Sequence, residues 1–134
     1  ILNTADGSLL RTLVGFTKPI MSVAYSVMNG LIAATSEDTL IHIWNMNSNI
    51  DDKLTEDTPA LTLIGDNSGS VSCCSFNTEG SRLVTGTRDA MLIVWDVSYS
   101  NIQGKTELKP LKTLHACHQD WINDCAWSDL GDIV

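Results

Sequence analysis

Short hydrophobic runs separated by turn residues follow one another along the chain. Each run holds about four to six residues that are rich in β-branched and aromatic types, and Gly, Asn or Asp separates the runs. The predicted strands are 20–25, 31–34, 40–44, 71–76, 82–85 and 91–95. The predicted turns are Asn29-Gly30, Glu37-Asp38, Glu79-Gly80 and Arg88-Asp89. Because no stretch keeps a helical period, the pattern predicts an all-β chain built from hairpins.

The hydrophobic pattern repeats with a step of 51 residues. The positions that keep this step are Ile20, Val71 and Ile122; Tyr25, Phe76 and Trp127; Asp38 and Asp89; and Trp44 and Trp95. The first strand of each unit also carries small residues, namely Ala24, Cys73, Cys74, Ser75, Cys125 and Ala126. A strand that is covered on both faces in a narrowing space needs small residues, as the inner strand of a propeller blade does. The period therefore predicts a repeat protein made of stacked sheets.

The units resemble WD repeats, and the resemblance spans essentially the whole chain. The matching segments are Ala34-Thr35-Ser36-Glu37-Asp38 with Ile43-Trp44-Asn45, Thr85-Gly86-Thr87-Arg88-Asp89 with Val94-Trp95-Asp96, and the entry segments Leu13-Val14-Gly15 and Leu63-Ile64-Gly65. The resemblance implies a β-propeller of four-stranded blades. Two blades with flanking strands cannot close a ring, since propellers hold at least about four blades. We therefore expect a propeller fragment with an incomplete ring.

The register divides the chain into units that are joined by long loops. The boundaries are 1–7 for the end of a preceding blade, 8–46 for the first unit, 47–59 for a long inter-blade loop, 60–97 for the second unit, 98–110 for another long inter-blade loop and 111–134 for a truncated third unit. Family repeats run about 40–45 residues, so the two loops account for the longer step.

The resemblance gives a structural role to the residues of the repeat signature. These are Asp38, Trp44, Asp89, Trp95, Asp96 and His118. In the family, a His buries a hydrogen bond to the turn Asp. The corresponding position is Phe16 in the first unit, Asp66 or Asn67 in the second and His118 in the third. Since no unit has the full set of His, Ser or Thr, Asp and Trp, we expect the blades to depend more on packing than on this hydrogen-bond network.

The resemblance also implies a partner-binding rim. In the family, and in the β subunit of heterotrimeric G proteins in particular, partners contact the residues on either side of the first-strand Val or Ile and the residue before the turn Asp. These positions are Pro19, Met21, Glu37, Ser70, Ser72, Arg88, Trp121 and Asn123. Trp121 has two interpretations: it is either an exposed anchor for a partner or a side chain that packs between blades.

The charge balance limits the classes of partner. The chain has 16 acidic and 8 basic residues, for a formal net charge of −8. This balance disfavours direct binding to nucleic acid or to an anionic membrane, because both need a basic face. We expect other proteins as partners, with a basic surface as the compatible class, together with the remaining blades of its own chain. The alternative is that the acidic excess serves solubility alone.

The cysteines and the apolar runs indicate the compartment. Cys73, Cys74, Cys117 and Cys125 include no C-x-x-C spacing, and adjacent cysteines rarely pair. As small buried hydrophobes they predict a reducing compartment, and so a cytoplasmic or nuclear protein. No apolar run reaches the roughly 18 residues of a membrane helix.

No pattern of catalytic or cofactor-binding residues is present. The motifs G-x-S-x-G, G-x-x-x-x-G-K and G-x-G-x-x-G are absent from the sequence. His115-Ala116-Cys117-His118 lacks a second ligand pair at zinc spacing, and the acidic segment 51–57 lacks the alternation and the Gly of a calcium loop. We therefore predict that the chain is not an enzyme and holds no cofactor and no metal.

A narrower resemblance concerns residues 117–128. They are similar to repeats attached to large NACHT or NB-ARC proteins, such as the apoptosome scaffold and the telomerase-associated vault protein. Both resemblances imply a non-catalytic scaffold for protein–protein interaction within a larger intracellular multidomain protein. The alternatives are a structural component of a large ribonucleoprotein or vault-like particle, and a docking domain of an enzyme whose catalytic part lies outside this sequence.

Overall fold

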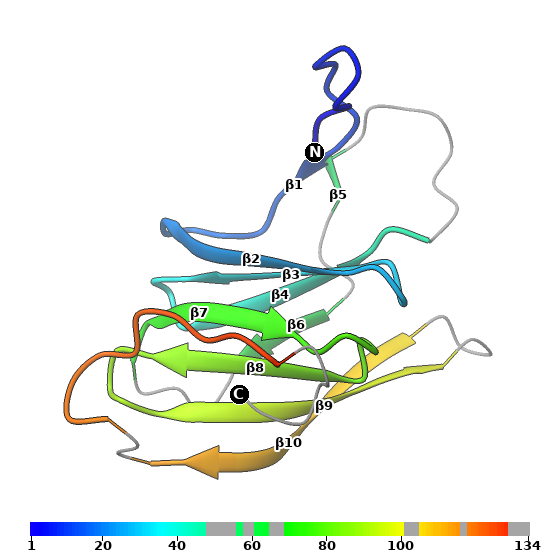
Figure 1. Ribbon diagram of the computed structural model, residues 1–134. Helices are drawn as coiled ribbons and strands as arrows, with labels where there is room; N and C mark the ends of the chain where they lie inside the picture. Colours follow the sequence, from blue (N-terminus) through cyan, green and yellow to red (C-terminus); the bar gives the residue numbers. More distant parts are fainter. Residues whose placement is uncertain (48–55, 58–60, 65–68, 101–104, 116–117, 129–134) are drawn as a thin grey trace.

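The computed structural model describes residues 1–47, 56–57, 61–64, 69–100, 105–115 and 118–128, and its regular elements are all β-strands (Figure 1). The strands are β1 (Thr12–Leu13), β2 (Ile20–Ser26), β3 (Leu31–Ser36), β4 (Leu40–Asn45), β5 (Glu56–Asp57), β6 (Leu61–Ile64), β7 (Val71–Phe76), β8 (Arg82–Thr87), β9 (Leu92–Ser100) and β10 (Lys105–Leu114). They form two antiparallel four-stranded sheets, β2-β3-β4-β6 and β7-β8-β9-β10, and a short parallel pair of β1 with β5. The prediction of a propeller fragment with four-stranded blades is confirmed.

The two sheets have the same internal register, displaced by 51 residues. Ile20 pairs with Ser36 in the first sheet and Val71 pairs with Thr87 in the second, and each ladder shifts its register directly after that pair. The outer ladders agree in the pairs Ile41–Leu63 and Leu92–Leu114. The predicted repeat therefore holds at the level of single residue pairs.

The blades do not coincide with the predicted sequence units. The fourth strand of the first blade is β6, which lies in the range 60–97 that was assigned to the second unit. β10 is the fourth strand of the second blade and ends at Leu114, inside the predicted third unit. Each blade is thus completed by the first residues of the following unit.

The prediction of a long loop over 98–110 is wrong for most of that range. β9 continues to Ser100 and β10 begins at Lys105. Val97 and Leu108 face each other across this hairpin and both are buried, so the hairpin extends beyond the Trp-Asp pair. Of the loop predicted over 47–59, Glu56–Asp57 forms β5, and 48–55 and 58–60 lie outside the described residues.

The hairpin turns form where the sequence predicts them. Gly30 and Gly80 connect the first and second strands of the two blades with positive φ values of 62° and 69°, which glycine adopts without steric cost. Thr39 and Ala90 follow the turn aspartates with φ values of 67° and 62°. These two residues occupy equivalent positions, so the same left-handed turn is built twice.

The core lies between the two sheets, where β2 and β3 pack against β7 (Figure 1). The core residues of the two sheets are Leu31, Ala33, Ile41, Ile43, Val71, Leu83 and Ile93. Full burial of an aliphatic side chain stabilises a fold by about 1.5–3 kcal/mol. The packing of one blade on the next is therefore a main source of stability.

Among the described residues, no neighbouring blade covers the opposite face of the first sheet. The residues of β7 that contribute to the contact between the blades are Val71, Cys74 and Phe76. Their equivalents in β2 are Ile20, Val23 and Tyr25, which are 54%, 63% and 55% exposed. An apolar patch of this kind marks a contact surface.

This difference yields a prediction for the isolated 134-residue chain. Because the chain exposes the face that blades normally cover, we expect it to self-associate or to unfold without a sharp transition. Replacing Val23 and Tyr25 by Glu should reduce the self-association seen in sedimentation. A monomeric chain that unfolds cooperatively would contradict the prediction.

Candidate partner-binding rim

The turns before the two signature aspartates lie at the same edge of their blades. The Glu37 N–H donates to the Pro19 carbonyl at 3.1 Å, and the Arg88 N–H donates to the Ser70 carbonyl at 3.0 Å. These equivalent hydrogen bonds tie each turn to the start of the inner strand. They place Glu37 and Arg88 in equivalent positions on neighbouring blades.

Arg88 joins the rim positions of all three units. Its Nη1 lies 3.2 Å from Oε1 of Glu37, and its Cζ lies 5.0 Å from the centroid of the Trp121 ring. A cation–π contact at an exposed site contributes about 0.5–1 kcal/mol, and an exposed ion pair about 0–1 kcal/mol. We call the three side chains Glu37, Arg88 and Trp121 the rim row. The row crosses from the first blade to the second and from the second blade to the third unit.

Among the described residues, Trp121 is exposed, with 58% of its surface accessible, and its ring lies against Arg88. Its neighbour Ile122 is buried and donates its N–H to the Thr87 carbonyl at 3.2 Å. The second indole of this segment, Trp127, is half-buried and donates its Nε1–H to the Ser75 carbonyl at 3.0 Å. Residues 121–128 therefore attach to the second blade, although they form no strand.

The other predicted rim residues differ in accessibility. Pro19 and Asn123 are exposed, whereas Met21, Ser70 and Ser72 are half-buried. The Ser72 hydroxyl hydrogen-bonds to the carbonyls of Gly86, at 3.1 Å, and of Ile122. Ser72 thus connects the second blade to the third unit, which the register alone could not show.

The second blade keeps more of the signature network than the sequence predicts. The Trp95 Nε1–H donates to Oγ1 of Thr85 at 2.9 Å, and the Thr87 hydroxyl donates to the Asp89 carboxylate. Thr85 and Thr87 alternate along β8 and so point to the same face. The second blade thus keeps two hydrogen bonds of this network, beside the packing on which we expect the blades mainly to depend.

The first blade builds an aromatic cluster at the signature position. Phe16 occupies the family's His position, and its ring centroid lies 4.2 Å from that of His42 and 6.0 Å from that of Trp44. The rings of His42 and Trp44 are 5.7 Å apart. His42 is not among the residues that the repeat register predicts. Its spacing of two residues from Trp44 on the same strand was the available signal.

Asp38 receives its hydrogen bonds from Thr17 and Leu40. Both the N–H and the Oγ1 of Thr17 lie 3.3 Å from Oδ2, and the Leu40 N–H donates to Oδ1 at 3.2 Å. Burial alone would raise the pKa of Asp38, but the hydrogen bonds from Thr17, Leu40 and Ser36 outweigh it and hold the pKa below its usual value. The carboxylate is a structural acceptor that fixes the turn beneath Glu37.

The remaining signature residues are at the surface. Asp96 is exposed and lies opposite Lys109 and Arg82 in the two ladders of β9. His118 is also exposed among the described residues. The buried role that the resemblance implies for it stays an expectation, because the step of 51 residues from Asp89 puts the turn Asp of its unit outside this sequence.

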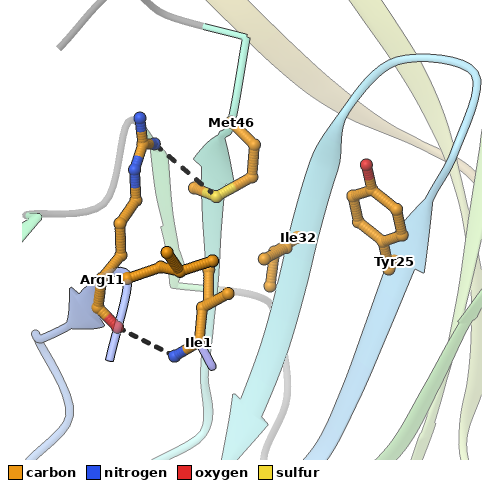
Figure 2. A pocket seen from close by; sticks show the side chains of 6 residues that line it. Ile1, Arg11, Tyr25, Ile32 and Met46 are labelled. Atoms are coloured by element: carbon orange, nitrogen blue, oxygen red, sulfur yellow. Dashed lines mark hydrogen bonds between the residues drawn. The ribbon is translucent and has the colours of Figure 1, made fainter. Parts of the chain in front are cut away.

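A separate apolar pocket of about 550 Å³ lies on the uncovered side of the first sheet (Figure 2). Its lining residues are Ile1, Leu10, Arg11, Tyr25, Ile32 and Met46. Arg11 is the one charged side chain among them, and its Nη1 lies 3.8 Å from Sδ of Met46. This lining holds no carboxyl, imidazole or thiol group. Together with Tyr25, the pocket extends the exposed apolar face.

In the part of the chain that the structure describes, no three side chains of the His, Cys, Asp or Glu type gather closely enough to hold a metal ion. None of the elements in this part is a helix long and apolar enough to cross a membrane.

Comparison with known proteins identifies the family. The WD domain, G-beta repeat model matches residues 7–45 and 57–96, which together are more than half of the chain. The chain therefore belongs to the WD-repeat family. It is 33% identical over 113 residues to telomerase protein component 1 of Rattus norvegicus, a match that covers 83% of this chain and 4% of that protein.

Two further relatives have other names. The periodic tryptophan protein 2 homolog of Mus musculus is 28% identical over 107 residues, which cover 77% of this chain and 11% of the relative. The ribosome biogenesis protein WDR12 homolog of Ixodes scapularis is 24% identical over 158 residues, which cover 100% of this chain and 36% of the relative. The chain thus spans only a small part of each relative's length.

The buried His42 yields a prediction for pH. Burial lowers the pKa of His42 below its usual 6.5, and this outweighs the attraction of Asp38 and the hydrogen bond of the Gly15 carbonyl. In the unfolded chain the ring regains its ordinary pKa, so the unfolded state binds the proton first as the pH falls. The stability that the neutral ring contributes is complete above about pH 6.5 and is lost as the pH falls toward the lower, folded-state pKa.

The measurement is the thermal unfolding midpoint of the intact protein between about pH 7.5 and about pH 5. One such group limits the slope to about 1.4 kcal/mol per pH unit. The matched control is His42→Ile, because Ile93 occupies the equivalent position in the second blade. The variant should lose less stability over this range. Equal losses would show that His42 does not titrate as described.

Proposed function

We propose that this chain is a non-catalytic, protein-binding part of a WD-repeat propeller in a larger intracellular protein, with the rim row as its binding surface. The observation that supports this most is the exposed Trp121, which is held by Arg88 of the preceding unit and, through it, by Glu37. Membership of the WD-repeat family supports the scaffold role. The absence of catalytic motifs in the sequence agrees with it.

The rim row has the properties of an interface anchor. Truncation of a large aromatic at the centre of an interface commonly costs at least about 2 kcal/mol of binding energy. Trp121 has one ring face against Arg88, while its backbone is fixed by the buried Ile122. Less freedom is then lost on binding, and this preorganisation favours affinity.

The charges around the rim row favour a partner with a basic surface. Asp120 and Asp124 flank Trp121 in the sequence and are exposed, and the Asp120 carboxylate accepts the Trp121 N–H at 2.8 Å. Glu37 balances Arg88, so the aspartates leave an acidic excess beside the indole. The net charge of the whole chain, −8, has the same sign as this local acidic excess. A basic partner would associate faster, and its association would slow with added salt.

The apolar face with Ile20, Val23 and Tyr25 has a different proposed partner. Their equivalents in the second blade are covered by the first blade. We assign this face and its pocket to the remaining blades of the same protein. The rim row is left for other proteins.

A second candidate function is that of a structural component of a ribonucleoprotein particle. The name of the relative telomerase protein component 1, at 33% identity, favours it. On this alternative, the outer strands β6 and β10 would make the contacts with the particle, and the rim row would not contribute to binding. The relatives named for telomerase and ribosome biogenesis also favour an intracellular location, with the nucleus included.

Replacing Trp121 separates the two functions. In the intact protein, Trp121→Ala should weaken partner binding by at least about 2 kcal/mol while leaving the unfolding midpoint unchanged. Arg88→Ala and Glu37→Ala should have smaller effects, mainly on the association rate. Partners that co-purify with the unaltered protein and are lost with Trp121→Ala would be identified by quantitative mass spectrometry. Their affinities would then be measured by calorimetry.

The matched control is Trp127→Ala, which removes the half-buried indole of the same segment. Because Trp127 donates to the Ser75 carbonyl, this variant should lower the unfolding midpoint. If Trp121→Ala lowered the midpoint by several degrees and left binding intact, the rim row would not be the binding surface.

A further inference from the structure

The contact between the two blades is repeated where the third unit meets the second blade. The Cys74 Sγ lies 4.0 Å from the Ala33 carbonyl oxygen, and the Cys125 Sγ lies 3.9 Å from the Val84 carbonyl oxygen. Both residues of the second contact are displaced by 51 positions from those of the first. Cys125 therefore sits on the second blade as Cys74 sits on the first.

The same displacement brings two thiols together. At the first contact, Sγ of Cys74 lies 3.7 Å from Oγ of Ser22. The residue of the second blade that corresponds to Ser22 is Cys73, so Cys73 and Cys125 face each other at the second contact. The two thiols also act on each other, because each shifts the pKa of the other.

Close packing fixes the thiol of Cys73 at this contact. A Cβ atom on Gly86 would lie 2.6 Å from Sγ of Cys73 and 2.6 Å from a methyl carbon of Ile122, so only glycine fits there without displacing one of them. Cys73 is buried, and Cys125 is half-buried. Among the described residues, Cys125 is therefore the more accessible thiol of the pair.

We propose that Cys73 and Cys125 form a reversible disulfide that joins the second blade to the third unit when a peroxide is present. The proposal rests on the placement of both thiols at one contact and does not depend on the rim row. Neither cysteine is part of an established site. The resting state is the dithiol, in keeping with a reducing compartment.

The reaction balances with hydrogen peroxide as the oxidant. The Cys73 thiolate attacks one peroxide oxygen, the O–O bond breaks, and a sulfenic acid and hydroxide result, which a proton converts to water. The sulfur of Cys125 then attacks the Cys73 sulfur, an S–S bond forms, and the sulfenic oxygen leaves as a second water. Two thiols are oxidised and one peroxide is reduced to two waters. A reducing thiol reverses the bond by exchange.

The surroundings distinguish this pair from Cys74. The hydrogen bond from Cys125 lowers the pKa of Cys73 and outweighs its burial, and the same bond raises the pKa of Cys125. Burial raises the pKa of Cys74 to about 11, which keeps that thiol protonated. Since the thiolate is the nucleophile, we expect Cys73 to react and Cys74 to remain unmodified.

The test treats the intact protein carrying Cys74→Ser with hydrogen peroxide and then blocks free thiols with N-ethylmaleimide. After chymotryptic digestion, mass spectrometry should find Cys73 joined to Cys125, and dithiothreitol should release the two peptides. The treated protein should unfold several degrees higher than the untreated protein, and this shift should vanish with Cys125→Ser. If Cys74→Ser fails to fold, tandem fragmentation between residues 73 and 74 of the unaltered protein makes the same assignment.

A matched control uses the first contact. Ser22→Cys places a thiol opposite Cys74, at the position equivalent to Cys73, so it should also yield a cross-link. Cross-linking of this variant pair without linkage of Cys73 to Cys125 would overturn the proposal. Separate alkylation of Cys73 and Cys125 after the peroxide treatment, or sulfinic acid at Cys73 without a cross-link, would overturn it as well.

Discussion

The rest of the structure depends on the packing of one blade against the next. A four-stranded sheet has two faces, and the small residues of its inner strand allow a neighbouring sheet to approach closely. In the contact between the two blades, aliphatic side chains such as Ile43, Val71 and Leu83 meet without accessible surface. The Ser22 hydroxyl also accepts the Cys74 N–H across it, at 3.3 Å. This contact sets how one blade is placed relative to the next, and the rim row and the pair of thiols both depend on that placement.

The rim row forms because each blade is placed against the next in the same way. Glu37 and Arg88 would be ordinary surface charges on separate blades, but the packing brings them to 3.2 Å. The third unit then brings Trp121 to the other side of Arg88. A continuous surface therefore arises from three residues that are 51 and 33 positions apart in succession, each on its own turn or loop. Function of this kind resides in the arrangement of repeats and not in any one of them.

The sequence predicted the parts of the fold that follow from periodicity. The 51-residue step, the hairpin turns at Gly30 and Gly80 and the all-β class all rest on local patterns, and the structure has them. The strand residues 98–100 and 105–110 could not be predicted, because this segment is mostly polar and its pairing is supported by the contact of the buried residues Val97 and Leu108. Local patterns also do not say which unit supplies the fourth strand.

The site was predictable only in part, for a physical reason. The register gives the positions of Glu37, Arg88 and Trp121, but their contacts depend on side-chain lengths and on the angle between blades. The same limit applies to Ser72, which the register assigns to the rim but whose hydroxyl hydrogen-bonds to the Ile122 carbonyl. The pairing of Cys73 with Cys125 needs both the step and the observed Ser22–Cys74 contact.

The most direct test of the blade-packing account is a cryo-electron microscopy structure of the intact protein. We expect another β-sheet to lie on the face of β2 and to bury Ile20, Val23 and Tyr25 as the first blade buries their equivalents in β7. We also expect the same displacement to relate this sheet to the first blade. A structure in which those three side chains remain open to solvent would contradict the account.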